Sequence, residues 1–515
     1  MSESFFERPI LNSPYGHPGR HWELDDDGQP TNRIIATRRR SELITPVPQS
    51  RKGKKSSKAG QGDLLTEEDG QEYVLKPIVN QIRAEVDAWR RLPSESQWRV
   101  TPHTARLLRH WREHQFNDVR PFFCQVEAAE TAIWLAEVAS RERPAHLALK
   151  HLQDANGDAN PELFRIALKL ATGAGKTTVM AMLIAWQTIN AVRMPGSNRF
   201  SRSFLIVAPG ITIRDRLRVL LPNDPENYYR TRELVPQDML DDVLKAKIVV
   251  TNYHAFKHRV TTDVARGTRR AIEGRDGKMA LLETDGQMLR RVMPELMHDK
   301  AIVVINDEAH HCYRERPLSD QEKLKGDDRK EADENNAAAR LWISGLEAIR
   351  RHRGMGIRTV YDLSATPFFL RGSGYREGTL FPWTVSDFSL VDAIESGIVK
   401  LPRVPIADNI PGGDMPQYRN LWDTIGKKMP RKGLLKGGKP VDPHSIPLQL
   451  QTALEALYGH YEKVFDLWEE KDIGVPPVFI VVCNNTTTSK LVHDYISGFF
   501  RYHDDDSRNF EPGRL

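Results

Sequence analysis

Cysteine is scarce in this chain, and long apolar runs are missing. The 515 residues contain three cysteines, Cys124, Cys312 and Cys483, which lie far apart and match no zinc-binding spacing. Such a small, dispersed set argues against a disulfide framework and favours a reducing cytoplasm. No run of 18 apolar residues occurs, and the start MSESFFERPIL lacks the pattern of a signal peptide. We therefore expect a cytoplasmic protein without a membrane segment.

A strong excess of one charge is also lacking. The 74 Lys and Arg residues against 69 Asp and Glu leave a net charge of +5, too small by itself to indicate a polyanionic partner. Residues 33–58, however, hold nine basic side chains and one acid, Glu42. This cluster either follows phosphates or belongs to a solvated linker. Residues 48–72 are poor in aromatic and β-branched side chains, which is typical of a flexible linker.

Short, continuous apolar runs recur along most of the chain. They occupy residues 204–208, 247–250, 301–305, 359–363 and 478–482. Continuous apolarity is typical of parallel strands that helices cover on both faces. Longer segments with helical periodicity separate the runs, so we expect an α/β fold with a doubly wound parallel sheet. Upstream, Ile78, Ile82, Val86 and Trp89 share one helix face, and Thr101-Pro102 has the pattern of a helix start.

The segment LKLATGAGKTT, residues 168–178, combines an alternating apolar stretch, a glycine turn and a helical pattern. This is the context of a phosphate-binding loop. Gly173 and Gly175 let backbone N–H groups converge on phosphate oxygens. Lys176 is expected to reach the β- and γ-phosphates, and the hydroxyl of Thr177 to bind Mg²⁺. Thr172, Ala174 and Thr178 complete the expected loop, whereas Leu170 stands where the strict motif has glycine.

A second motif, AIVVINDEAHHCY, covers residues 301–313. Asp307 and Glu308 follow an apolar strand, and ligands of open α/β sheets bind at the carboxyl ends of strands. Asp307 can therefore complete the Mg²⁺ shell, and Glu308 can orient and deprotonate an attacking water. The alternative is a helix N-terminus enriched in acids. Together the two motifs predict a site for ATP and Mg²⁺.

The order of these motifs resembles the superfamily-2 helicases and translocases. ATGAGKT is followed by DEAH at residues 307–310 and by SAT at residues 364–366. Within that group the chain is most similar to the Res subunit of type III restriction enzymes, over about residues 115–500. The resemblance implies two RecA-like lobes, with ATP between them and DNA across both. We expect an N-terminal extension at 1–110, a first lobe at 111–405, a connector at 406–447 and the start of a second lobe at 448–515.

The resemblance also implies roles for individual residues. Gln125, in RPFFCQVEA, would read the adenine edge, and His310 with the SAT residues Ser364, Ala365 and Thr366 would couple the nucleotide to DNA. The DNA backbone would meet Pro209, Thr212, Arg214, Thr251 and Asn252. Simpler readings stay open, since Ser364 and Thr366 could cap a strand end and Thr251-Asn252 could form an ordinary turn. His311 is expected to be a loop neighbour without a catalytic role.

Two charged segments lie beyond these motifs. Residues 317–335 are expected to form an exposed loop. The connector carries a basic cluster that either contacts DNA phosphates or is a solvated loop, made of Lys427, Lys428, Arg431, Lys432, Lys436 and Lys439.

The sequence thus predicts the motor portion of a Res-like subunit, an ATP-dependent translocase or helicase. Its expected partners are double-stranded DNA and a methyltransferase-type specificity subunit. The alternatives are a stand-alone DEAH helicase of another defence or repair system, and an ATP-dependent DNA-binding module that does not hydrolyse ATP. The chain shows no arginine-finger segment of the form Q-x-x-G-R-x-x-R and no P-D…E-x-K nuclease signature. We therefore expect slow hydrolysis by this chain alone.

Overall fold

The computed structural model describes residues 4–25, 28–41, 67–210, 215–261, 281–316, 327–402, 421–429, 441–502 and 508–514. It divides into two compact units, Met1–Leu401 and Pro402–Leu515. Several predictions fall on residues outside the described ranges: most of the linker at 48–72, the basic cluster beyond residue 41, and most of the connector.

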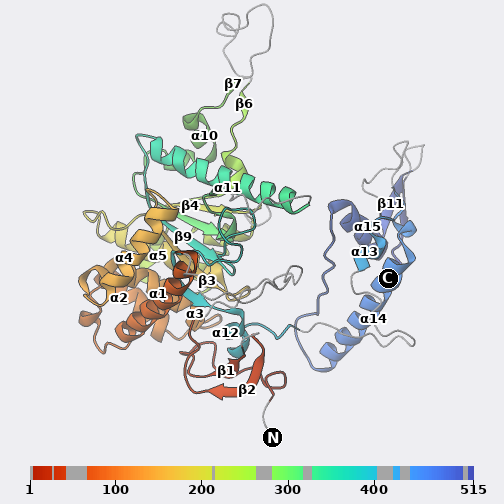
Figure 1. Ribbon diagram of the computed structural model, residues 1–515, viewed down its shortest axis with the longest axis horizontal. Coiled ribbons are helices and arrows are strands. Elements are labelled where there is room, and N and C mark those ends of the chain that lie inside the picture. Colours follow the sequence, from red (N-terminus) through yellow and green to blue (C-terminus); the bar gives the residue numbers. More distant parts are fainter. Residues whose placement is uncertain are drawn as a thin grey trace, which may run out of the picture. The chain divides into compact units, whose positions relative to one another are not determined.

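A six-stranded, all-parallel sheet forms the centre of the first unit (Figure 1). Its strand order is β10-β3-β9-β8-β4-β5. The strands are β3 (Arg165–Leu170), β4 (Ser203–Ala208), β5 (Lys247–Asn252), β8 (Ile302–Asp307), β9 (Ile357–Ser364) and β10 (Thr384–Phe388). Five of these match the predicted runs and the stretch before the glycine turn. The exception, β10, was not predicted because its sequence TVSDF has few apolar residues.

Helices cover both faces of this sheet. Along β4, Phe204 and Ile206 pack into one hydrophobic cluster, whereas Leu205 and Val207 pack into another. The first cluster includes helices α3 (Phe123–Ile133) and α5 (Lys176–Arg193), and the second includes α10 (Asp285–Val292) and α11 (Asp327–Arg351). Because successive side chains of a strand point to opposite faces, two covered faces require a continuously apolar strand. The predicted doubly wound, RecA-like α/β fold is confirmed.

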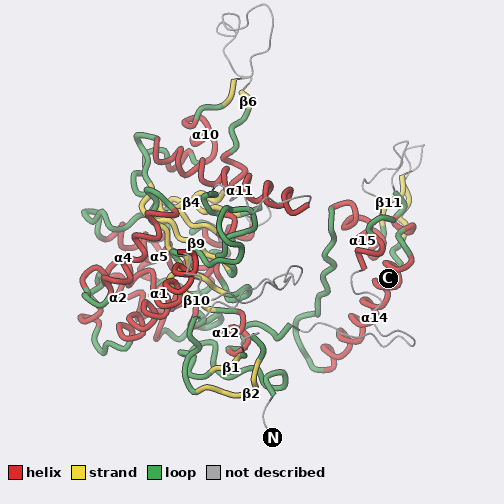
Figure 2. The backbone as a smooth tube through the Cα atoms, in the orientation of Figure 1, coloured by secondary structure: helices red, strands yellow, loops and turns green. Residues whose placement is uncertain are grey.

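The N-terminal residues fold onto this same unit. The helices predicted there are α1 (Glu67–Arg90) and α2 (Pro102–Glu113), and the Thr101 hydroxyl caps α2 by accepting from the Thr104 amide at 3.1 Å. An antiparallel hairpin of β1 (His21–Leu24) and β2 (Pro30–Ile35) lies beside α12 (Leu390–Glu395), as Figure 2 shows. Among the described residues of the unit, the remaining α-helices and strands are α4 (Ala145–Ala159), α7 (Tyr228–Thr231), α8 (Leu240–Val243), β6 (Val260–Thr261) and β7 (Leu281–Leu282).

The loop predicted at residues 317–335 is wrong for its second half. Residues 327–335 begin α11, whereas 317–326 lie outside the described ranges. The helix forms because Ala332, Ala339, Trp342 and Leu346 recur at helical spacing and are buried, which outweighs the charge of the segment.

The second unit contains α13 (Leu421–Ile425), α14 (Leu448–Glu470), α15 (Thr486–Ser497) and a hairpin of β11 (Phe499–Tyr502) with β12 (Arg508–Glu511). The strand predicted at 478–482 is wrong, since the described residues form no strand there. The alternation of a strand is nevertheless present. Val478, Ile480 and Val482 are 80–89% exposed, whereas the Phe479 ring lies 5.1 Å from that of Tyr461. No described neighbour supplies the ladder hydrogen bonds that would complete a strand.

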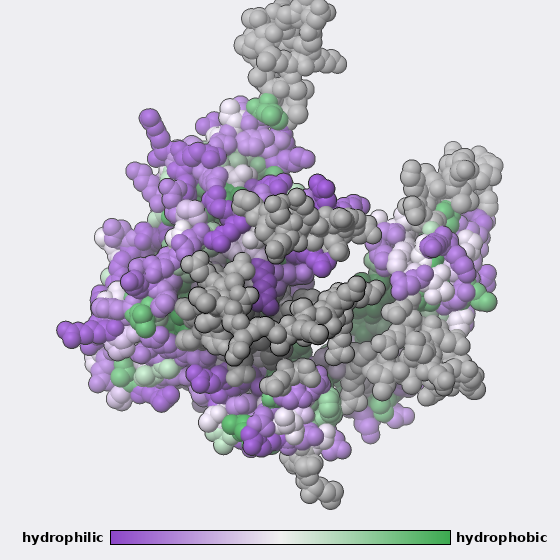
Figure 3. Space-filling model, in the orientation of Figure 1, coloured by the Kyte–Doolittle hydropathy of each residue, from purple (hydrophilic) through white to green (hydrophobic). Residues whose placement is uncertain are grey.

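The visible surface of the first unit is mainly hydrophilic (Figure 3). Among the described residues, no helix is long and apolar enough to span a bilayer.

Candidate nucleotide site

The strands that carry the predicted motifs are direct neighbours in the sheet. β9 lies between β3 and β8, and all three run parallel. Their carboxyl ends therefore open on one edge, where β3 leads into the glycine turn, β9 ends at Ser364 and β8 ends at Asp307. The fold thus brings the three motifs together at the edge where open α/β sheets bind ligands.

The glycine turn has the backbone that its sequence predicts. Gly173 and Gly175 adopt φ values of 86° and 81°, in the left-handed region that favours glycine. Gly175 is the N-cap of α5, so the helix begins at Lys176 with its free N–H groups at the turn. Thr172 is exposed, Ala174 is buried, and Thr177 is half-buried in the first turn of the helix. This combination of turn and helix N-terminus is suited to binding phosphate.

Lys176 and the acidic pair lie on the same side of the sheet. The Lys176 ammonium is 2.6 Å from Oε1 of Glu308, and its side chain is only 12% exposed. Burial and the neighbouring Glu308 raise the pKa of Asp307 to about 6, although the charge of Lys176 acts against this. Thr177 and Asp307 supply hydroxyl and carboxylate oxygens, which are the donors that Mg²⁺ prefers, so these residues fit a metal bound together with phosphates.

His310 and Ser364 connect the second and third motifs. His310 Nδ1 lies 3.2 Å from the Ser364 hydroxyl, which also accepts a hydrogen bond from the Thr366 amide at 3.1 Å. Burial and the neighbouring His311 lower the pKa of His310 to about 4, so the imidazole is neutral near pH 7. Ser364 therefore caps the strand end and also contacts the second motif. Ala365 is half-buried, and Thr366 is exposed.

Gln125 contacts the glycine turn itself. Its Nε2 donates to the Ala174 carbonyl at 2.9 Å, and its Oε1 accepts from the Phe122 amide at 3.0 Å. A Cβ atom at Gly175 would lie 2.2 Å from Nε2 of Gln125, so this glycine is also required for space. The structure places Gln125 beside the turn, and its contact with adenine stays a prediction.

The predicted DNA-contacting residues fall at the ends of two neighbouring strands. Pro209 follows β4, and Thr251 and Asn252 end β5, which pairs with β4 in parallel. The Asn252 side chain accepts from the Ala255 amide at 3.1 Å and thereby caps a short helix, and the DNA contacts of these residues stay predictions. Thr212 and Arg214 lie outside the described residues.

Two neighbours of the turn could not be predicted from the sequence. Nη1 of Arg232 donates to the Thr178 hydroxyl at 3.0 Å, and its guanidinium lies 3.7 Å from the Tyr228 ring centroid. Near Gly173, Cγ2 of Val399 would lie 3.3 Å from a Cβ atom at that glycine. Both residues come from distant segments and match no motif, so only the tertiary fold reveals them.

The comparisons with known proteins agree with this geometry. Residues 119–346 match the family model described as type III restriction enzyme, res subunit. These residues form a Res-family domain. The Res-family domain contains the glycine turn and the acidic pair, and the match ends before the SAT motif. No curated protein and no solved structure matches the chain.

Proposed function

We propose that the chain is the ATP-dependent motor portion of a type III restriction Res-like subunit, acting as a translocase or helicase on double-stranded DNA. The observation that carries this proposal is the 2.6 Å pair between Lys176 and Glu308, because it sets the phosphate-binding lysine against the acidic motif. The Res-family domain at residues 119–346 supports the same reading.

Each site residue would have its own role in nucleotide binding and hydrolysis. Lys176 and the N–H groups at the start of α5 would bind phosphate oxygens, and Thr177 and Asp307 would hold Mg²⁺. Bound Mg²⁺ supplies positive charge that offsets the negative charge of the phosphates. Glu308 would orient and deprotonate water. The neutral His310, in contact with Ser364, would pass the state of the site toward the strand ends that carry Pro209, Thr251 and Asn252.

The macromolecular partners belong to the same proposal. Duplex DNA would run along the carboxyl edge of β4 and β5, and a methyltransferase-type subunit would supply sequence recognition. The Res-family match supports this partner, because Res subunits in general work with such a subunit.

Nucleotide binding by Lys176→Ala tests the proposal. The substitution removes the ammonium, so we expect no detectable binding of a fluorescent ATP analogue with Mg²⁺. Glu308, which loses its partner, is 31% exposed and can be solvated, so the melting temperature should stay close to that of the wild type. Lys150→Ala, at a surface position of α4, is the matched control. Unchanged affinity in Lys176→Ala would show that the site assignment is wrong.

A further inference from the structure

Two residues from outside the glycine turn lie beside it. Gln125, from α3, binds the Ala174 carbonyl and fills the space beside Gly175. Val399 lies beside Gly173, since its Cγ2 would be 3.3 Å from a Cβ atom at that position. The amides of Ile398 and Val399 both donate to the Ala393 carbonyl of α12, at 2.9 and 3.2 Å. The positions of α3 and α12 therefore determine where these two side chains meet the turn.

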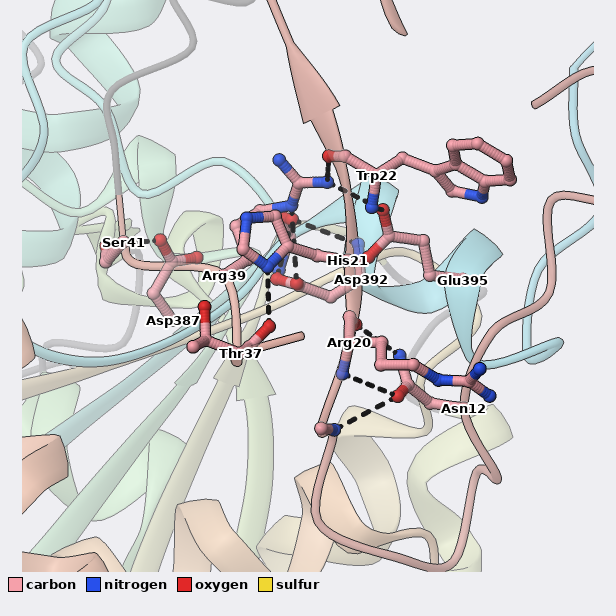
Figure 4. A network of polar contacts seen from close by, with 12 residues as sticks. Asn12, Arg20, His21, Trp22, Thr37, Arg39, Ser41, Asp387, Asp392 and Glu395 are labelled. Atoms are coloured by element: carbon pink, nitrogen blue, oxygen red, sulfur yellow. Dashed lines mark hydrogen bonds and ion pairs between the residues drawn. The ribbon is translucent and has the colours of Figure 1, made fainter. Parts of the chain in front are cut away.

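The N-terminal segment, residues 4–41, binds α12 through Glu395. The Leu11 and Asn12 amides donate to the Glu395 carbonyl, and the Trp22 amide donates to its carboxylate at 2.9 Å (Figure 4). The Trp22 ring is fully buried and packs with Phe5 and Ile394 in a small hydrophobic cluster. The segment is thus a packed part of the unit that contains the site.

Two consecutive arginines of this segment bind the two helices. The Arg38 guanidinium donates to both carboxylate oxygens of Glu127 at 2.6 Å, two residues from Gln125 on α3. Nη2 of Arg39 donates to Glu395 of α12 at 2.6 Å and to the Trp22 carbonyl at 2.7 Å (Figure 4). All four charged side chains are at most 11% exposed. Two adjacent residues of the N-terminal segment therefore connect α3 and α12.

Hydrogen bonds to other elements hold the backbone around Arg39 in place. Arg83, from α1, donates to the Arg39 carbonyl at 2.9 Å and to the Asp387 carbonyl of β10 at 2.6 Å. The Ser41 hydroxyl donates to the Asp387 carboxylate at 2.6 Å. Because buried ion pairs are costly to desolvate, they contribute little net stability but leave an unpaired charge when one partner is lost.

We propose that Arg38 and Arg39 are positioning residues of the nucleotide site, holding α3 and α12 in place beside the glycine turn. The N-terminal segment then contributes to nucleotide binding. This inference rests on the proposed function, since it assumes that the turn binds nucleotide.

Nucleotide affinity of the full chain tests this proposal. Arg38→Gln and Arg39→Gln should each raise the Kd of a fluorescent ATP analogue about tenfold. Arg38→Lys and Arg39→Lys keep the charge but lose the guanidinium fork, so they should show smaller increases and retain the fold if the glutamine variants do not. Arg33→Gln is the control, because Arg33 pairs with Glu23 on the same segment but is 67% exposed and should leave Kd unchanged.

Hydrogen exchange separates positioning from a general loss of structure. In folded variants without nucleotide, the peptide covering residues 170–178 should exchange faster, whereas peptides from β4 and β5 should keep their protection. Lysine variants with wild-type Kd and wild-type exchange at 170–178 would overturn the inference. If the wild type binds nucleotide and Lys176→Ala does not, the proposed site stands. A negative result with the lysine variants then refutes only the role of Arg38 and Arg39. If the wild type itself does not bind, the proposed function fails first.

Discussion

Glu308 occupies a left-handed backbone conformation, with φ of 49°, directly after the strand that ends at Asp307. Non-glycine residues rarely adopt this region, and those that do cluster at functional sites. In this conformation the Glu308 carboxylate lies 2.6 Å from the Lys176 ammonium. Under the proposed function, substitution at Glu308 separates nucleotide binding from hydrolysis.

Glu308→Gln should bind nucleotide but hydrolyse it slowly. The amide keeps the size of the side chain and cannot take a proton from water, so we expect turnover to fall by about 10²-fold or more. Direct binding and phosphate release, measured with DNA present, report the two effects. A matched loss of affinity and turnover would contradict the assigned role.

Gly175→Ala should disrupt the turn. The added Cβ would lie 2.2 Å from Nε2 of Gln125 and would strain a residue at φ of 81°, so a loss of about 1–3 kcal/mol is expected, together with weaker nucleotide binding. Gly157→Ala is a matched control on α4, where a Cβ atom meets nothing within 4 Å. There alanine should stabilise by about 0.5–1 kcal/mol. Urea denaturation of both variants checks the contrast.

Asn252 has a structural role that must be separated from any contact with DNA. Asn252→Asp keeps the oxygen that accepts from the Ala255 amide, but adds a negative charge at the end of β5. If this residue faces the DNA backbone, DNA affinity should fall while the melting temperature is retained. Asn252→Ser preserves a capping oxygen without the charge and should bind DNA normally. Equal affinities for both variants would remove Asn252 from the DNA surface.

Glu395, the last residue of α12, has a buried carboxyl that binds the N-terminal segment. Burial raises the pKa of Glu395 to about 7, with Asp392 adding to the shift and Arg39 and the Trp22 amide opposing it. In the unfolded chain the carboxyl titrates near 4.5, so between pH 4.5 and 7 the folded state binds more protons. The stability contributed by this group therefore falls as the pH rises through that range.

Glu395→Gln removes this titration. The difference in unfolding free energy between wild type and variant should accordingly shrink between pH 5 and pH 8, as measured by urea denaturation. Glu23→Gln, at a more exposed site, should show no such trend over the same range. A difference that stays constant over this range would mean that the carboxyl is ionised throughout it.

Predictability from sequence differed among elements for physical reasons. β4 and β8 could be predicted because both of their faces are buried, which favours continuous apolar side chains. β5 lies at the end of the sheet and is only partly buried, but its apolar side chains pack against both hydrophobic clusters, and the second half of β9 is buried between β3 and β8. The glycine turn and acidic pair could be predicted because phosphate chemistry restricts residue types there. β10 could not be predicted, since its polar residues Ser386 and Asp387 are buried by partners such as Ser41 and Lys169 from other segments. Such partners are known only once the chain has folded.

The second unit offers a test of DNA contact through salt dependence. Lys427 and Lys428 follow α13 and are exposed. If both neutralise phosphates, replacing them with glutamine should reduce the slope of log K against log salt by about two. Lys463→Gln, on the exposed side of α14, should leave the slope unchanged. An unchanged slope in the double variant would mean that the pair belongs to a solvated loop.

The exposed apolar side chains at residues 478–482 affect the tendency of the protein to aggregate. Three β-branched residues, Val478, Ile480 and Val482, face solvent in alternation, and segments of this composition readily template sheet formation between molecules. Purified material should consequently become turbid or form oligomers as its concentration rises. Substituting Ile480 with lysine would place a gatekeeper charge in the segment and keep the sample monodisperse.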